Sequence, residues 1–156
     1  PGGVHGRAFG SHGMIDAIIQ RLEQQCPTLK TVEGAVDLSN LMGSQFAVIF
    51  ETRPAAFVMF GGDNAGKNEM GTDEVVQVLT ETATIAICVG DGKTGAKQVA
   101  EDAIMTVRNA VLVCLLGFVP EAQRGALQYR GAMPLAMQPR TIWFAMSFAR
   151  SYGVNG

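Results

Sequence analysis

The chain has 156 residues, of which 47% are hydrophobic and 17% charged, and its formal net charge is −2. This length is enough for one domain that buries a core without disulfides or metal ions, and the composition is typical of a globular protein rather than a disordered one. The near-neutral charge excludes a generally basic surface for nucleic acid. The chain has neither the run of ~20 apolar residues that spans a bilayer nor a visible secretion signal. We therefore expect synthesis in the cytoplasm.

The first 13 residues differ from the rest of the chain, because they include five glycines and follow neither a helical nor a strand period. Their last four residues, Gly-Ser-His-Gly, are similar to a remnant of a cloning vector, which would place the natural start at Met14. A glycine-rich arm has no core of its own. If it is native and ordered, we expect a neighbouring subunit to hold it. The predicted organisation is an arm at residues 1–13 and a single domain at residues 14–156.

The expected elements alternate between helix and strand patterns along this domain. In chain order they are a helix at Met14–Gln25, a strand at Leu29–Glu33, a helical turn or loop at Asp37–Met42, a buried strand at Phe46–Phe50, a strand at Ala55–Phe60, an open loop at Gly61–Asp73, a long strand at Val75–Val89, a helix at Thr94–Leu116, and strands at Ala126–Arg130 and Thr141–Ala149.

The helix expected at Thr94–Leu116 organises the fold. Its apolar residues recur with the i, i+3, i+4, i+7 spacing of one helix face, and Gly117 is placed to end it in a left-handed turn. Its last turns, from Val111, are apolar nearly all round, so we expect them to be buried or to cover another chain. With β-rich segments on both sides, the predicted class is α+β, a mixed and mostly antiparallel sheet packed by one long helix and a short N-terminal helix.

No catalytic set emerges from the sequence. The histidines, His5 and His12, both lie in the arm, so a histidine-based triad or metal site in the domain is close to excluded. The three cysteines are an odd number, each within an apolar pattern, and we interpret them as buried thiols. Glu81 lies in a predicted strand, and we expect its carboxylate to be solvated. We predict no catalytic residue, no metal and no cofactor.

The segment Gly61–Lys67 fits the phosphate-loop pattern G-x-x-x-x-G-K. The pattern requires a Ser or Thr hydroxyl at the next position for magnesium, and here that position is Asn68. The motif should also open a helix, whereas this one leads into a β-rich run. We therefore interpret the segment as a hairpin loop and keep a nucleotide- or ligand-binding protein that uses this loop as the alternative function.

Three groups of residues resemble the tail-terminator (tail-completion) proteins of long-tailed bacteriophages, most closely the Mu-like and lambda-like sets. The chain opens with a helix of the Met-Ile-Asp-Ala-Ile kind, has a long helix that runs into a Leu-Gly-Phe-x-Pro corner, and closes on an aromatic strand. The resemblance covers residues 14–155, and its motifs are Met14–Ile18, Leu116–Pro120, Leu127–Gly131 and Trp143–Tyr152.

This resemblance implies a hexameric ring that caps the tail tube, ends its polymerisation and joins the tail to the head connector. It implies a non-enzymatic virion protein at the head-proximal end of the tail, with the tail tube protein and connector proteins as partners. The genomic DNA would pass through the lumen without specific binding, and no membrane is involved.

The candidate residues for contacts with other subunits or with the tube come from surface that a monomer does not need. The acidic loop should project from the ring, and arginines at strand ends are candidates for ion pairs between subunits. These residues are Arg53, Asp63, Lys67, Glu69, Asp73, Arg130 and Arg140. Two rivals remain: a nucleotide-dependent enzyme that uses Lys67 or Lys93, and a binding module with an apolar pocket under the long helix.

Overall fold

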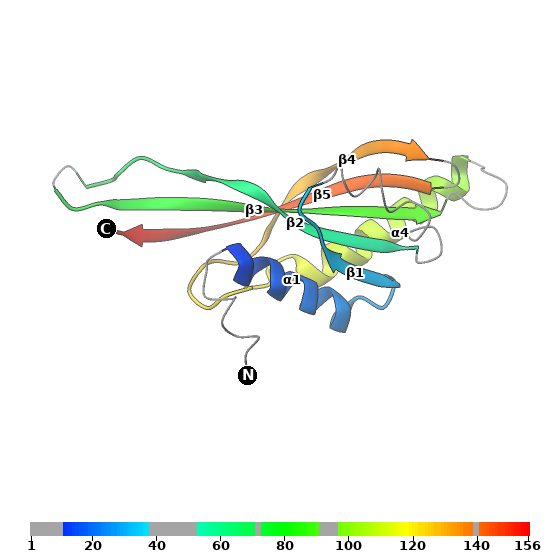
Figure 1. The fold of residues 1–156 in the computed structure, drawn as a ribbon, viewed down its shortest axis with the longest axis horizontal. Coiled ribbons are helices and arrows are strands. Elements are labelled where there is room, and N and C mark those ends of the chain that lie inside the picture. Colours follow the sequence, from blue (N-terminus) through cyan, green and yellow to red (C-terminus); the bar gives the residue numbers. More distant parts are fainter. Residues whose placement is uncertain (1–10, 38–52, 71–72, 91–96, 139–140) are drawn as a thin grey trace.

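The computed structural model describes residues 11–37, 53–70, 73–90, 97–138 and 141–156. Figure 1 shows the elements, which are α1 (Ser11–Gln25), β1 (Thr31–Gly34), β2 (Ala55–Ala65), β3 (Val76–Gly90), α4 (Lys97–Leu115), β4 (Gln128–Gln138) and β5 (Thr141–Asn155). The strands form one sheet in the order β1-β2-β3-β5-β4. The β1–β2 pair is parallel and the other described pairs are antiparallel. The predicted α+β class is confirmed.

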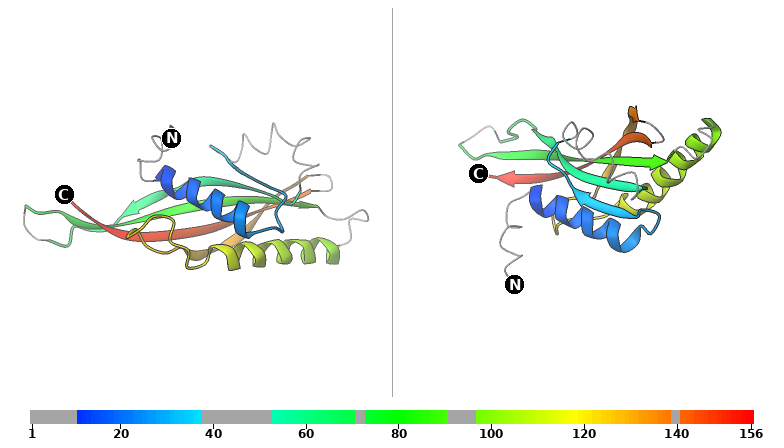
Figure 2. Two further views of the ribbon diagram at one scale, coloured as in Figure 1. Left: turned by 90° about the horizontal axis from the view of Figure 1, so that it is seen from below. Right: turned by 45° about the vertical axis from the view of Figure 1, so that its right-hand side comes forward.

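Both helices bury their apolar stripes on the same face of the sheet. Met14, Ile18 and Leu22 of α1 are fully buried at four-residue spacing, and Val107, Val111 and Leu115 of α4 repeat that pattern. Gly117 ends α4 with φ of 80°, as predicted. The helix side chains pack with one face of the strands, including Val58, Ile85, Ile87, Phe144 and Phe148. Figure 2 shows the two helices lying along that face.

The opposite face of the sheet is also apolar at one end. Phe57, Cys88 and Trp143 form a second buried cluster, and the ring centroids of Phe57 and Trp143 are 6.0 Å apart. In the sequence, Ile142, Phe144, Met146 and Phe148 alternate with less apolar residues, a pattern that predicts one strongly apolar face. Instead β5 is buried on both faces from Thr141 to Met146, and Trp143, which lies between Ile142 and Phe144, belongs to the second cluster.

The loop predicted at Gly61–Asp73 is wrong over its first five residues, because β2 continues to Ala65 and pairs with β3 up to Leu79. The 15 β-forming residues at Val75–Val89 fit either one long twisted strand or a run divided by a bulge. The structure has one 15-residue strand, β3, which pairs continuously with β5. The irregularity lies in β2, where the register shifts between Phe60 and Gly62. Glycine suits this bulge because Gly62 has φ of 107°.

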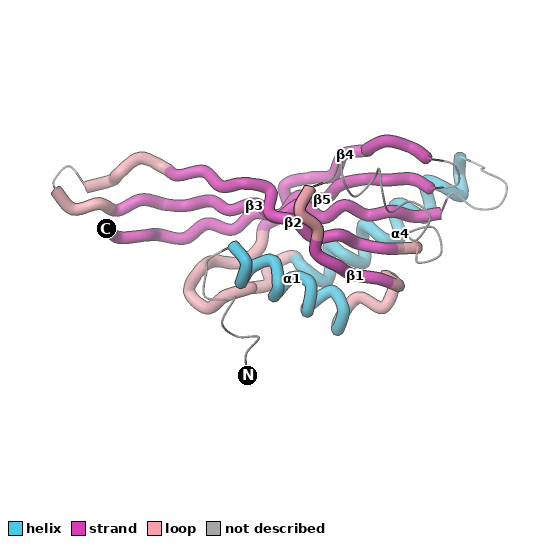
Figure 3. Tube along the Cα trace, viewed as in Figure 1, coloured by secondary structure: helices cyan, strands magenta, loops and turns pink. Residues whose placement is uncertain are grey.

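Consequently three strands project well beyond the helices (Figures 1 and 3). We call this part the extension and define it as residues 61–70, 73–80 and 151–156. Its ladder continues past β2, since the Gly66 amide donates to the Val78 carbonyl (2.8 Å) and the Glu69 amide to the Val76 carbonyl (2.9 Å). The extension is therefore a regular sheet rather than an open loop.

Several predicted boundaries move. The first helix begins at Ser11, so residues 11–13 belong to α1 and not to the arm. The strand predicted at Leu29–Glu33 lies at Thr31–Gly34. The strand predicted at Ala126–Arg130 continues through Pro134 to Gln138, with register shifts on either side of Gly131–Pro134. Three further expectations lie outside the described residues, namely the turn at Asp37–Met42 from residue 38 on, the strand at Phe46–Phe50 and the start of the long helix at Thr94.

Candidate assembly surface

A buried ion pair lies where the extension leaves the body of the domain. Glu81 and Arg150 are opposite each other on β3 and β5, and only 3% and 1% of their surfaces are exposed. The Arg150 guanidinium donates to Glu81 Oε1 from Nη2 (2.9 Å) and from Nε (3.2 Å). The expectation of a solvated Glu81 is wrong, because the strand pattern could not reveal that an arginine on a distant strand lies beside it.

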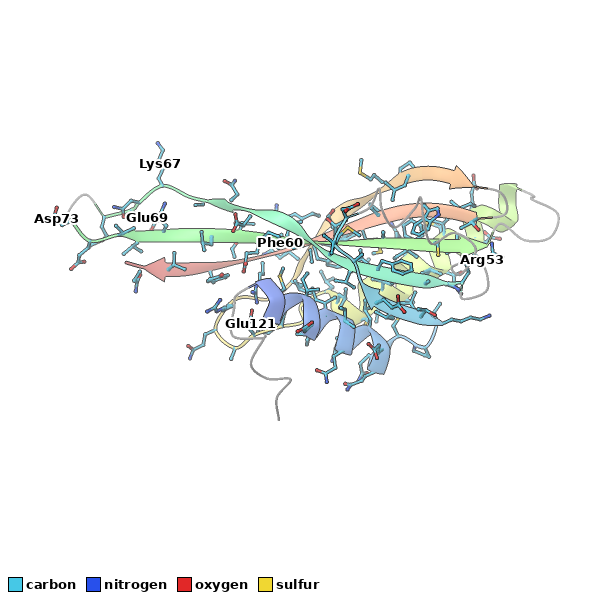
Figure 4. The ribbon with its side chains drawn as sticks, in the orientation of Figure 1. Arg53, Phe60, Lys67, Glu69, Asp73 and Glu121 are labelled. Atoms are coloured by element: carbon cyan, nitrogen blue, oxygen red, sulfur yellow. The ribbon has the colours of Figure 1, made fainter. Side chains whose placement is uncertain are left out.

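The loop between α4 and β4 completes this network. Glu121 Oε1 accepts a second bond from Arg150 Nη2 at 2.6 Å, and Figure 4 shows Glu121 beside the base of the extension. Arg124 and Arg150 place their guanidinium carbons 5.1 and 5.3 Å from the Tyr152 ring centroid. Burial, a hydrogen bond to Glu81 and the Glu81 charge raise the pKa of Tyr152. The network thus fastens the loop to the base of the extension.

Beyond this network the extension is exposed and acidic. Figure 4 shows Lys67, Glu69 and Asp73 toward its far end, and Asp63 lies on β2 opposite Glu81. All four are exposed. Val75, Val78 and Met70 are apolar, yet each exposes between 38% and 40% of its surface.

Asn68 holds the end of the hairpin together. Its Oδ1 accepts bonds from the amides of Val76 (2.9 Å) and Met70 (3.2 Å), and its Nδ2 donates to the Glu74 carbonyl (3.1 Å). In the sequence, Asn68 stands out only as a residue that breaks the phosphate-loop pattern. Asparagine is a residue that commonly closes turns in this way.

The resemblance of Gly61–Lys67 to a phosphate loop has a structural explanation. Gly61 and Gly62 lie in the bulged strand, and the Gly66 amide is used in the ladder with Val78. A phosphate-binding loop needs such amides free and converging on the ligand. Figure 4 shows Lys67 pointing away from the strands into solvent. The segment therefore lacks the geometry of a phosphate site.

The predicted interface arginines lie apart from the acidic residues. Arg53 is at the opposite end of the sheet (Figure 4) and its Nη1 donates to Thr141 Oγ1 at 3.1 Å. Arg130 is exposed on β4 at the register shift between Tyr129 and Gly131. Arg140 lies outside the described residues. The structure therefore brings Asp63, Lys67, Glu69 and Asp73 into the extension and places Arg53 and Arg130 elsewhere.

A second uncovered surface lies at the C-terminal end of α4. Val111 and Leu115 face the core, but Val113 exposes 83% and Leu116 57% of its surface. Val119, just beyond the helix, is also exposed. The nearly all-round apolar pattern is explained by these two sets, because one set packs inside the domain and the other remains exposed.

The cysteine thiols are buried, and burial raises the pKa of each, that of Cys88 to about 11. Thiolates are therefore disfavoured at neutral pH.

Within the described part of the chain, no group of three or more His, Cys, Asp or Glu residues is placed to hold a metal ion. No helix in that part is long and apolar enough to cross a membrane. Two shallow hollows lie beside α1 and β1, with Glu23 at the edge of both.

Comparison with known proteins identifies a family. The family model described as "Phage tail terminator protein" matches residues 14–155. No curated protein sequence matches the chain. Among solved structures, a chain from the "Virion of native gene transfer agent (GTA) particle" aligns with a TM-score of 0.37 and 16% sequence identity, covering 96% of this chain and 88% of that one. The family is identified by the family model alone, which covers residues 14–155.

Proposed function

Because the chain belongs to the phage tail terminator family, we propose that six copies form a ring that caps the tail tube, ends its polymerisation and joins the tail to the head connector. The coarser statement, that the chain is a structural component of a phage tail and its virion, follows from the family. The ring, its position at the head-proximal end and its partners, the tube protein and the connector proteins, are the proposal.

The observation that carries this proposal is the extension. Strands are stable when at least one apolar face is covered, yet the extension projects beyond both helices (Figure 2) and leaves Val75, Val78 and Met70 partly exposed. A ring is a closed heterologous contact, in which one patch of each subunit meets a different patch of the next. The extension, with its two different edges, and the exposed end of α4 supply surface for such a contact.

The charge of the extension suits a DNA channel. Asp63, Glu69 and Asp73 are exposed there, together with Lys67. Like charge keeps a polyanion from adhering. We propose that the acidic end faces the lumen or the adjoining tube, so that DNA passes without specific binding.

We further propose that the protein acts without catalysis or a cofactor. The burial of the three thiols and the pairing of Glu81 with Arg150 support this, because both remove reactive groups from solvent. Against the nucleotide-binding alternative stands the Gly66 amide, which is bonded within the sheet. ATP should therefore leave the melting temperature unchanged, and a stabilisation by ATP that Lys67→Ala abolishes would restore the alternative.

Tail length in the absence of the protein tests the function directly. Tubes assembled without the chain should grow past their normal length, and added chain should stop growth and appear as a ring at one end in electron micrographs. Tubes of normal length without the protein would contradict tail termination. Oligomers of another size would contradict the hexamer alone.

A further inference from the structure

The edges of the described sheet are protected everywhere except in the extension. An exposed edge invites pairing with another chain, and proteins block it with short strands, charge, proline or bulges. The edge strand β1 has four residues, and β4 has two register shifts and Pro134. The outer edge of β2 is interrupted by the bulge at Gly61, but beyond the bulge Asp63–Ala65 form a regular strand with no neighbouring strand on that side among the described residues.

The end of β5 has none of these devices. Among the described strands, β4 pairs with β5 only as far as Ala149. Residues 151–155 continue alone on that side and contain neither a charge nor a proline. Their pairing with β3 has no bulge. The loop at Gly125 approaches the carbonyl of Ser151, whereas a Cβ added at Gly153 would meet nothing within 4 Å. The unprotected edge therefore begins beyond Ser151.

The direction of the free backbone groups follows from one hydrogen bond. The Gly156 amide donates to the Val75 carbonyl, so in this antiparallel ladder Val154 and Tyr152 also bond inward to β3. The backbone amide and carbonyl groups of Gly153 and Asn155 consequently point outward, away from β3. On β2 the Gly66 amide donates to the Val78 carbonyl. By the same alternation, the backbone amide and carbonyl groups of Asp63 and Ala65 point outward, at the opposite edge of the extension.

We propose that the end of β5 pairs with the outer edge of β2 in the next copy of this chain, an inference that rests on the ring proposed above. Strands β2 and β5 are both antiparallel to β3, so rotation about a ring axis brings them together in parallel. In the matching register Gly153 lies opposite Asn64 of the next copy. Its amide donates to the Asp63 carbonyl, and its carbonyl accepts from the Ala65 amide.

Charge complementarity favours this occupant. Arg124 stacks on Tyr152, which shares the helix-side face with Arg150 and Glu81. Asp63 lies opposite Glu81 and therefore on that same face. Joining the two edges brings the Arg124 guanidinium of one copy toward the Asp63 carboxylate of the next. With six copies the extensions form a barrel of ~18 strands, a size class that leaves an aqueous channel.

Engineered disulfides test this pairing. In the full chain, Asn64→Cys combined with Gly153→Cys places two thiols opposite each other on adjacent strands of neighbouring copies, within disulfide reach. Mild oxidation should give a ladder of cross-linked species up to the complete ring on a non-reducing gel. Asn64→Cys with Gln24→Cys, on the exposed side of α1, is the matched control and should give no ladder.

Native mass spectrometry of the same samples separates the two proposals. Oligomers in which the Asn64–Gly153 pair cross-links no better than the control would overturn the edge pairing and leave the ring intact. A chain that stays monomeric at every concentration and on tail tubes would overturn both. As a second arm, Gly153→Pro removes the outward amide and should weaken assembly at least tenfold, whereas Gly153→Ala, which keeps that amide, should assemble normally. Normal assembly of the proline variant would also overturn the pairing.

Discussion

Arg150 is the residue on which the base of the extension depends most. It is almost fully buried, and its partners Glu81 and Glu121 come from a central strand and from the loop after α4. Two carboxylates balance the guanidinium, while Nη1 is a buried nitrogen without a hydrogen-bond partner among the described residues. Removing one member of a buried pair leaves an uncompensated charge, which costs more than the pair itself contributes.

Substitutions in this network should therefore lower the free energy of unfolding by unequal amounts. Arg150→Met should lower the free energy of unfolding by about 3–5 kcal/mol, because it leaves the Glu81 carboxylate buried and unpaired by arginine. Glu121→Gln should cost about 1 kcal/mol or less, since its side chain is 25% exposed and Glu81 still balances Arg150. Urea denaturation measures both. Equal losses would contradict the greater cost of breaking the buried Glu81–Arg150 pair.

The buried thiols predict a dependence of stability on alkaline pH. Burial raises the pKa of Cys88 from 9.0 to about 11 in the folded chain. The unfolded thiol therefore ionises first, so this contribution to stability is complete below pH 9 and is lost as the pH rises toward 11. Cys88→Ala should flatten the thermal stability profile in this window relative to the unaltered chain. An unchanged slope would contradict the role of Cys88.

At the scale of elements, β5 joins the two cores of the domain. Phe144 and Phe148 share one buried cluster with Val107 and Val111 of α4, while Trp143 on the other face belongs to the second cluster. The strand then leaves the body and forms one side of the extension. A single strand thus connects packing in the body to the position of the exposed surface.

Truncation of the core aromatic on this strand should be costly. Phe144→Ala should lower the free energy of unfolding by about 3–5 kcal/mol, because Phe144 is 4% exposed and a cavity remains. Phe60→Ala is the matched control, since Phe60 is 43% exposed, and it should cost about 1 kcal/mol or less. Similar losses for both variants would contradict the assignment of the two faces.

At the scale of the whole molecule, the extension and the body have different roles. The described residues at 67–77 are exposed or half-buried, and none belongs to either core cluster. The body should therefore fold without them. The proposed assembly, in contrast, needs the surface that they provide.

Shortening the hairpin separates these roles. Replacing residues 67–77 by Asn-Gly joins the paired residues Gly66 and Val78 through a tight turn. Circular dichroism should show a folded domain with a melting temperature within a few degrees of the original, while tail termination should be lost. Normal tails from this variant would exclude the end of the extension as the docking surface.

The N-terminal residues provide an independent prediction. Deleting residues 1–10, which precede α1, should leave the melting temperature unchanged and weaken assembly, because we expect this arm to contact a neighbouring subunit. Analytical ultracentrifugation measures the change. If the truncated chain assembles normally, the arm plays no part in the ring.

Local patterns in the sequence were sufficient for the fold class and for the long elements. The 3.6-residue period of α4, the glycine that ends it and the β-branched run of β3 each depend on neighbours along the chain, and so they predicted their elements within a few residues. The family resemblance over residues 14–155 was likewise readable from local motifs, and the family model confirms it.

Tertiary structure alone decided the role of the polar residues. Glu81 resembles any strand carboxylate until β5 brings Arg150 beside it, and Gly61–Ala65 resembles a loop until β3 supplies its hydrogen-bond partners. The Val111–Leu116 pattern predicted an end that is buried or covers another chain, but only packing against the sheet decides which residues remain exposed. The sequence determined the elements because their periodicity is local. It left the assembly surface open because pairing and burial depend on residues far apart in the chain.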